Sequence, residues 1–254
     1  MLRRLSLATL ALLLAPLILL ADPYNAEAKQ EKIRRGWDFA GLPLVNFTTD
    51  RGMGYGAYIA SFYHGPDGAG DAPYKGSIGG QFYQTTGGYS FHKLLLDFPN
   101  IANTGIRFDM TSGYETWDSA WYFGLGNKSP RLEKEDAPDR YYEFDSKSIW
   151  AVPNLRVPFA GNWSLFSGLV LRSTEITAYE NSLLEAENPS GIEGGFLSQV
   201  QAGLIFDSRD KEPSASQGIF SEVSLRGANV ATASDFALWG ANMTHRQWVP
   251  LTAD

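Results

Sequence analysis

The chain has 254 residues, enough for one large domain or two small ones, and it contains no cysteine. The missing cysteines exclude disulfide frameworks and thiolate-based metal or redox sites. The net charge is -7, whereas a nucleic-acid-binding protein carries a basic surface, so we expect no nucleic-acid partner. Aromatic residues make up 13% of the chain and glycines number 26. This composition is typical of a membrane β-barrel, in which every second strand residue faces lipid.

The first 28 residues have the pattern of a secretory signal peptide. Arg3 and Arg4 form a positive start, residues 5–21 are almost wholly apolar, and residues 26–28 (AEA) offer a small-x-small cleavage site. The apolar run is too short for a membrane span, so we expect it to be removed. We divide the chain into a signal peptide (1–28), a short periplasmic segment (29–36) and one barrel domain (37–254).

The rest of the chain consists of runs in which apolar and polar side chains alternate, separated by turn residues. In 196–206, for example, Phe196, Val200 and Leu204 share one face, and Gln199 lies on the other. Successive side chains on a strand point to opposite faces, so this pattern predicts an all-β antiparallel fold. We predict ten strands, at 41–49, 53–63, 75–85, 88–98, 104–117, 140–157, 162–178, 196–207, 218–228 and 235–249.

Strand length separates a membrane barrel from a soluble β-sandwich, which shows the same alternation. Strands of soluble proteins usually have about 5–6 residues, whereas a tilted strand crossing a bilayer needs about 9–11. Most predicted strands reach the longer class. Aromatic residues also gather near strand ends, as in the girdles of outer-membrane barrels. They include Trp37, Phe39, Phe62, Tyr63, Trp121, Phe123, Tyr141, Tyr142, Trp163 and Trp248. The alternative is that these aromatic residues form the core of a soluble all-β protein.

The connections predict an orientation for an up-and-down barrel. Short or proline-bearing connections follow the fourth, sixth, eighth and tenth strands, all at one end. The other end carries the charge-dense 127–140 and the polar 181–195. Outer-membrane barrels have short periplasmic turns and longer outer loops, so we place the second end outside. The long connection 64–73 departs from this rule.

Three segments, in order along the chain, carry a family resemblance. They are 121–127 (WYFGLGN), 202–210 (AGLIFDSRD) with a following proline and glycine, and 246–251 (RQWVPL). Together they resemble the YYGxGN segment, the G-x-x-x-D-x-R-D…P…G strand-turn-strand and the VPL turn of the bacterial surface antigen family. This family is the barrel part of the BamA/TamA outer-membrane assembly superfamily. The resemblance assigns structural signature roles to Gly124, Gly126, Asn127, Gly203, Asp207, Arg209, Asp210, Pro213 and Gly218.

The resemblance implies a barrel of sixteen strands, of which ten are predicted here. We therefore expect the chain to be the N-terminal part of a longer barrel, because an open sheet edge in hydrocarbon leaves backbone groups unpaired. A complete ten-stranded barrel is the alternative. Too few residues separate Ala28 from the first strand for a POTRA domain, the module with which the family's assembly members capture clients. Residues 225–228 (LRGA) do not match the family's V-R-G-F/Y motif.

Two functions follow from this resemblance. The first is insertion or translocation of proteins at the outer membrane, with unfolded outer-membrane or translocated proteins as clients. The alternative is a passive pore or structural surface antigen that lacks POTRA domains and assembly activity. Outer-membrane lipid and lipopolysaccharide are the expected surroundings in both cases.

The sequence gives little support to an enzyme or a metal site. His64, His92 and His245 have no metal-ligand spacing, and no G-x-S-x-G nucleophile motif is present. Residues 67–71 (DGAGD) lack the ligand pattern of a calcium loop and are typical of a glycine-rich turn. We therefore expect no catalytic residues, no metal and no cofactor.

Charges on the polar strand faces have two interpretations. Glu222 and Arg226 share a face, and Arg172 and Arg209 lie on or beside neighbouring strands. Such charges either set up a field across a pore or neutralise one another within a filled interior. At the turn after 196–207, we expect Asp207 to face the interior. Arg209 and Asp210 are expected to pair with each other or with the backbone of the turn.

Overall fold

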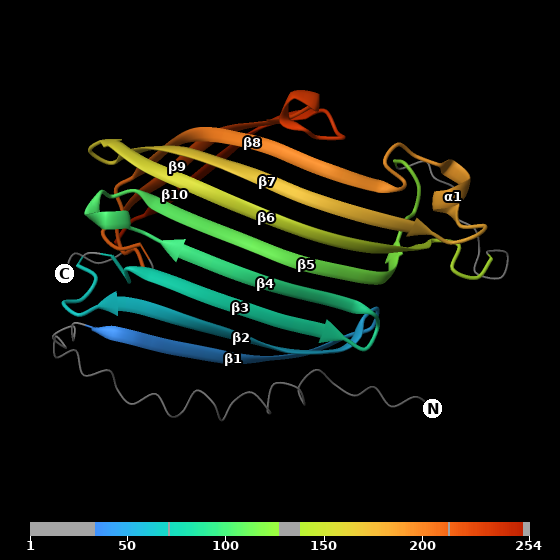
Figure 1. The fold of residues 1–254 in the computed structure, drawn as a ribbon, viewed down its shortest axis with the longest axis horizontal. Coiled ribbons are helices and arrows are strands. Elements are labelled where there is room, and N and C mark those ends of the chain that lie inside the picture. Colours follow the sequence, from blue (N-terminus) through green and yellow to red (C-terminus); the bar gives the residue numbers. More distant parts are fainter. Residues whose placement is uncertain (1–33, 71, 127–137, 213, 251–254) are drawn as a thin grey trace. The chain divides into compact units, whose positions relative to one another are not determined.

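The computed structural model describes residues 34–70, 72–126, 138–212 and 214–250, and within them the chain forms one antiparallel sheet of ten strands. All of these residues belong to one compact unit, Arg34–Asp254. Each strand pairs with the next one along the chain (Figure 1). The strands are β1 (Gly36–Thr48), β2 (Gly52–Gly65), β3 (Gly76–Thr85), β4 (Tyr89–Phe98), β5 (Arg107–Trp121), β6 (Glu143–Ala160), β7 (Trp163–Ala178), β8 (Gly194–Asp207), β9 (Gly218–Ala228) and β10 (Leu238–Trp248). No ladder joins β1 to β10 in the described residues, so both edges are open there.

The prediction of ten antiparallel strands is confirmed, with most ends shifted by a few residues. The largest error lies in β1, which begins at Gly36 and not at residue 41. Trp37 and Phe39 already pair with Tyr63 and Ser61 of β2. Residues 36–40 already alternate, with Trp37 and Phe39 on one face and Asp38 on the other, so the strand begins before Gly41.

Short helical segments occur only at strand ends within the described residues. α1 (Leu183–Glu187) lies between β7 and β8, and 3-10 turns span Ile101–Asn103 and Val230–Thr232. The hydroxyl of Ser182 caps α1 by accepting a hydrogen bond from the backbone N–H of Glu185 at 3.2 Å. The sequence showed no helical period here because α1 is little more than one turn long. No helix in the described part of the chain is long and apolar enough to cross a membrane.

One face of the sheet, the outer face, is apolar and exposed across all ten strands. Paired residues in an antiparallel ladder lie on the same face, so the register follows this face from strand to strand. Its side chains are up to 76% exposed, at Phe39. They include Phe39, Val45, Ile59, Phe82, Leu94, Tyr114, Ile149, Leu165, Val200, Leu204, Leu225 and Met243.

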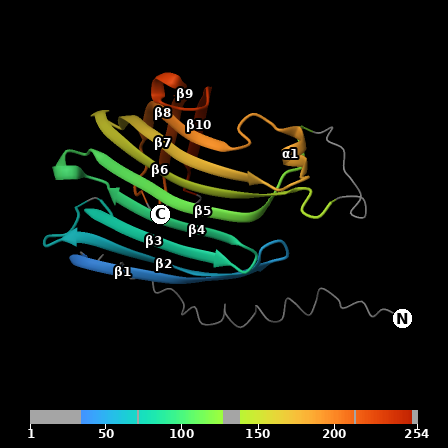
Figure 2. The ribbon, with the colours of Figure 1, turned by 45° about the vertical axis from the view of Figure 1, so that its right-hand side comes forward.

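The opposite face, the inner wall, is polar and concave. Figures 1 and 2 show the sheet curling so that β9 and β10 pass behind β6 and β7. Side chains two strands apart meet on this face, although strands two apart are separated by about 10 Å. The amide of Gln201 on β8, for example, donates to the amide oxygen of Asn154 on β6 at 3.0 Å. Such contacts require side chains that converge on the concave side.

Aromatic side chains lie at both ends of the outer face. Trp37 stacks near Tyr63 at one end with ring centroids 4.9 Å apart, and Trp121 stacks on Phe123 at the other at 5.7 Å. On β1 the apolar band runs from Trp37 to Phe47. That length corresponds to about 24 Å for a strand tilted by about 45°, close to the ~25 Å band of outer-membrane barrels.

Glycines on the inner wall let neighbouring strands approach closely. A Cβ atom at Gly56 would lie 2.1 Å from the carbonyl oxygen of Phe82 and 2.8 Å from the Cα atom of Tyr83. Both are backbone atoms, which cannot move aside without disturbing the β2–β3 ladder. At Gly41, on the outer face of β1, the nearest such atom is the carbonyl oxygen of Tyr58 at 3.8 Å, an ordinary contact.

Gly56→Ala is therefore expected to destabilise the sheet, whereas Gly41→Ala is tolerated. We expect a loss of about 1–3 kcal/mol for Gly56→Ala, which is the usual range for forcing an extra carbon into a packed position. Urea titration of each variant in detergent, followed by tryptophan fluorescence, measures the difference. Equal midpoints for the two variants would contradict the close approach at Gly56.

Candidate functional site: the charged inner wall

The densest group of charges on the inner wall lies at one rim, around Arg107. This arginine is the first residue of β5, and its guanidinium donates two hydrogen bonds to the carboxylate of Asp97 at the end of β4, both at 2.8 Å. The Tyr74 hydroxyl donates to the same carboxylate at 2.7 Å. Burial, and then this bond to Asp97, raise the pKa of Tyr74 to about 12. Arg107 also pairs with Glu212 from the turn between β8 and β9. The two-bond geometry with Asp97 fixes the orientation of the guanidinium.

The turn between β8 and β9 is fastened to the same rim by a second arginine. Asp207, the last residue of β8, faces the inner wall and accepts two hydrogen bonds from Arg209, both at 2.8 Å. Arg156 of β6 also donates to Asp207, at 3.3 Å. The Arg209 guanidinium lies 4.9 Å from the ring centroid of Phe220. With Glu212 held by Arg107, the turn folds onto the wall at two points.

Asp210 organises the turn itself. Its carboxylate accepts hydrogen bonds from the backbone N–H groups of Ser216 (3.0 Å) and Gln217 (3.3 Å), and from the Ser216 hydroxyl (2.5 Å). The Ser216 hydroxyl bond is the main reason why the pKa of Asp210 is lowered to about 2. The expected contact of Asp210 with turn backbone is therefore present. Arg209 also contacts the turn backbone, because its Nη1 donates to the carbonyl oxygen of Glu212 at 3.2 Å, and its acidic partner is Asp207.

The signature glycines lie where backbones approach closely or bend. A Cβ atom at Gly203 would lie 2.2 Å from the carbonyl oxygen of Val223, and one at Gly218 would lie 2.3 Å from that of Ser208. Gly218 has φ +110°, which favours glycine. Gly124 and Gly126 follow β5, also with positive φ. Asn127 and Pro213 lie outside the described residues.

A second polar group lies farther along the inner wall. Arg172 of β7 donates to Glu115 of β5 at 3.4 Å and to the Ser148 hydroxyl of β6 at 3.1 Å. The Tyr89 hydroxyl of β4 donates to Glu115 at 3.0 Å. This group therefore joins four neighbouring strands through side chains alone.

Other charges on the wall are not paired in this way. Glu222 and Arg226 both lie on the inner wall, as predicted, but no ion pair joins them in the part of the chain that the structure describes. The Ser224 hydroxyl donates to Glu222 at 3.4 Å. The inner wall thus combines ion pairs that neutralise each other with single charges that water can reach. The ion pairs agree with a filled interior, and the single charges agree with a pore.

The histidines lie far apart on the sheet. The His64 ring nitrogen Nε2 is 3.1 Å from Asp38, and the His245 Nδ1 is 2.8 Å from the Ser221 hydroxyl. His92 stacks on other rings of the outer face. Among the described residues, no three histidine or acidic side chains are grouped so that they could hold a metal ion.

Sequence reasoning found Asp207, Arg209 and Asp210 but missed Arg107, Asp97 and Glu212. Arg107 and Glu212 are 105 residues apart, and no local pattern connects them. The sequence feature that could have pointed to Arg107 is its position: it is a charged residue on the polar face at the start of a strand. That strand end lies at the same rim as the β8–β9 turn. Chemically, the group around Arg107 pairs partly buried charges and holds the β8–β9 turn.

Replacing Arg107 is expected to loosen the rim more than replacing Glu212. Arg107→Leu leaves two carboxylates without their partner, and we expect a loss of about 1–3 kcal/mol. Glu212→Gln removes one partly exposed pair, for which we expect less than about 1 kcal/mol. Denaturant unfolding in detergent gives both values, while trypsin cleavage at Lys211 reports the turn. A Glu212→Gln effect as large as that of Arg107→Leu would argue against Arg107 as the centre of the group.

The turn is expected to depend on pH through Asp210. Its pKa is lower in the folded state (about 2) than the ~3.9 of an unfolded chain, so its stabilisation is complete above pH ~4. That stabilisation is lost as the pH falls through about 2. The melting temperature of Asp210→Ala should therefore lie below the wild-type value at pH 7 and approach it between pH 4 and 2. Asp67→Ala removes the same charge from another turn at this end and serves as the control. A difference that stays constant down to pH 2 would refute the assignment.

Comparison with known proteins finds a likeness among solved structures. No protein-family model matches the sequence, and no curated protein matches it. Among solved structures, the fold is similar to that of BamA from Haemophilus ducreyi lacking POTRA domains 1–3, with a TM-score of 0.49 and 14% sequence identity. The match covers 87% of this chain and 38% of that chain, so the chain spans well under half the length of that structure.

Proposed function

We propose that the chain forms part of the wall of a β-barrel in the outer membrane of a Gram-negative bacterium. The observation that carries this proposal is the separation of the two faces, apolar outside and polar inside, over ten neighbouring strands. Lipid on the convex side and water on the concave side satisfy both faces. Export through the predicted signal peptide at residues 1–28 belongs to the same proposal.

A soluble β-sandwich fits this arrangement poorly. Its second layer would have to cover the outer face, where Phe39, Val45 and Met243 are all about three-quarters exposed. In the described residues, α1 and the 3-10 turns lie at strand ends and do not cover that face. Exposed apolar surface of this extent is a sign of contact with a membrane or a protein partner.

Within the outer membrane, we propose a role in the insertion or translocation of proteins, without enzymatic activity. The support is the resemblance of the segments around Trp121, Asp207 and Trp248 to the BamA/TamA assembly superfamily. Clients would be unfolded outer-membrane or translocated proteins. The inward-folded β8–β9 turn fits a barrel whose interior is shaped by its own connections.

A passive pore is the second candidate, because the inner wall carries charges of both signs. The groups around Arg107 and Arg172 neutralise their own charges, while Lys93, Glu222 and Arg226 have no ion pair within the described residues. Charged side chains lining a lumen are compatible with a water-filled interior.

Membrane integration is tested by expressing the full chain with its leader in a Gram-negative host. The protein should sediment with outer membranes, resist extraction by alkaline carbonate and run faster on gels before boiling than after it. The reason is that a folded barrel keeps its hydrogen-bonded sheet in detergent. A mature chain that is soluble without detergent would disprove the membrane proposal.

The two roles are separated by reconstituting the purified chain in liposomes. An assembly factor should speed the folding of an added eight-stranded barrel several-fold over liposomes that hold an unrelated barrel. Planar-bilayer recordings test the pore. Conductance without acceleration would select the pore, and acceleration with no conductance would select assembly.

A further inference from the structure

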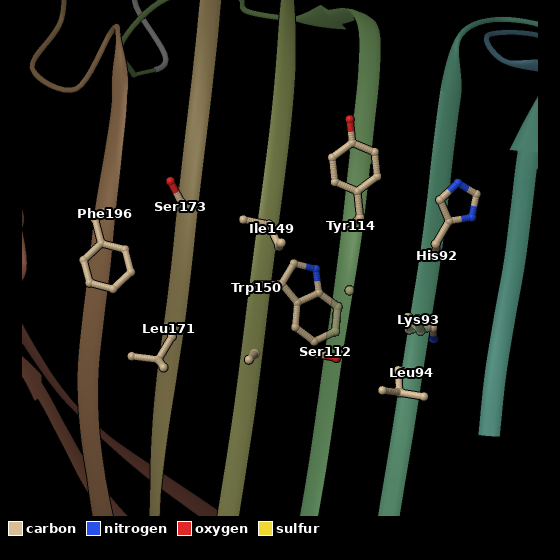
Figure 3. Close-up of a pocket in the computed structure, with 12 residues that line it drawn as sticks. His92, Lys93, Leu94, Ser112, Tyr114, Ile149, Trp150, Leu171, Ser173 and Phe196 are labelled. Carbon is tan, nitrogen blue, oxygen red and sulfur yellow. The ribbon is translucent and has the colours of Figure 1, made fainter. Parts of the chain in front are cut away.

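A hollow lies on the outer face across β4 to β8 (Figure 3). The hollow has a volume of about 560 Å³ and is lined mainly by apolar side chains. The ladders place Ser112 of β5 beside Ala151 of β6, and these two small side chains form its floor. In the next row, Tyr114 faces Ile149, and their larger side chains rise above this floor. The hollow thus lies where two small side chains adjoin a row of larger ones on the outer face.

Rings and aliphatic side chains wall the hollow on both sides. On β4, His92 stacks between Phe82 (ring centroids 4.6 Å apart) and Tyr114 (6.4 Å). On the far side, Phe196 of β8 pairs with Ser173 of β7. Figure 3 shows His92, Tyr114, Ile149, Ser173 and Phe196 in one row across the five strands. A shallow apolar trough of this kind fits a hydrocarbon chain.

Two opposite charges stand next to this row, toward the end of the sheet that carries α1. Lys147 of β6 pairs in register with Glu175 of β7 on the outer face, two residues beyond Ile149 and Ser173. Both side chains are exposed, and no ion pair joins them within the described residues. From Ala151 to Lys147 the strand advances by about 13 Å. A lipid whose headgroup meets Lys147 can therefore place the middle of an acyl chain on the floor.

We propose that the hollow binds one acyl chain of lipid A, the phosphorylated and acylated glucosamine lipid of the outer leaflet. Lys147 pairs with a phosphate of the headgroup. Glu175 holds that phosphate through a shared divalent cation, since carboxylates and phosphates are both preferred ligands of Mg²⁺ and Ca²⁺. This proposal rests on the proposed outer-membrane location, with the α1 end of the sheet outermost.

The choice of lipid follows from the two charges together with the outermost position of the α1 end. A phosphate facing Lys147 alone would be favoured in any anionic lipid, but Glu175 repels it unless a divalent cation lies between them. Bound lipid should therefore depend on divalent cations, a property that a zwitterionic phospholipid does not share.

The test uses the full chain purified from outer membranes in mild detergent, with retained lipids counted by native mass spectrometry. Wild type should carry about one lipid A per chain, and EDTA should strip it. Ala151→Phe fills the floor and should reduce retention at least about fivefold. Ala202→Phe places the same ring elsewhere on the outer face, between Ser167 and Leu225, and should leave retention unchanged.

The charged residues are tested by reversal. Lys147→Glu should abolish lipid A retention, whereas Glu175→Lys should preserve it and make it insensitive to EDTA, because a lysine binds the phosphate without a cation. Equal retention by Ala151→Phe and Ala202→Phe, or retention of phosphatidylethanolamine in place of lipid A, would overturn the proposal. Each variant must first sediment with outer membranes and resist alkaline carbonate as the wild type does. A wild type that does neither defeats the membrane proposal, while a membrane-integrated wild type without lipid A defeats the hollow alone.

Discussion

Backbone hydrogen bonding determines what the faces of this sheet can be. Each strand from β1 to β10 is hydrogen-bonded to its neighbours in the sheet, so most backbone N–H and C=O groups between the two edges are paired. The side chains then alternate between two environments. Because the sheet curves, polar groups on the concave side converge and can bond across an intervening strand, as Gln201 does with Asn154. Apolar groups on the convex side diverge and remain exposed.

The rim needs ion pairs because a carboxylate is partly buried there. At the end of β8 the chain reverses, and without a bound turn the Asp207 carboxylate would have no partner. Arg209 and Arg156 supply hydrogen bonds to it, and Arg107 holds Glu212 from the far side of the same turn. Asp207, Arg209 and Glu212 are thereby each paired with an opposite charge, and Asp210 is bonded to the backbone of the turn. These charged residues thus attach the β8–β9 turn to the inner wall.

Local alternation was enough to predict the strands and their faces, because a period of two is visible in any short window. It placed Leu204 and Phe206 on the outer face and Asp207 on the inner wall, as the register shows. The start of β1 was missed although Trp37 and Phe39 already continue the alternation. α1 was missed because a single turn has no measurable period. Neither error changes the order or the direction of a strand.

The contacts that could not be predicted are those that join distant strands. Arg107 and Glu212 meet because the sheet curls, and the hollow over Ser112 and Ala151 exists because two small side chains fall into register. Both depend on the register between neighbouring strands. A register shift of one residue would move these side chains to the opposite face. Alternation alone leaves that register open. The register is fixed by the irregularities in the β5–β6 and β6–β7 ladders, the close approach at Gly56 and the ion pairs around Arg107 together. The functional features of this wall therefore arise from the sheet as a whole.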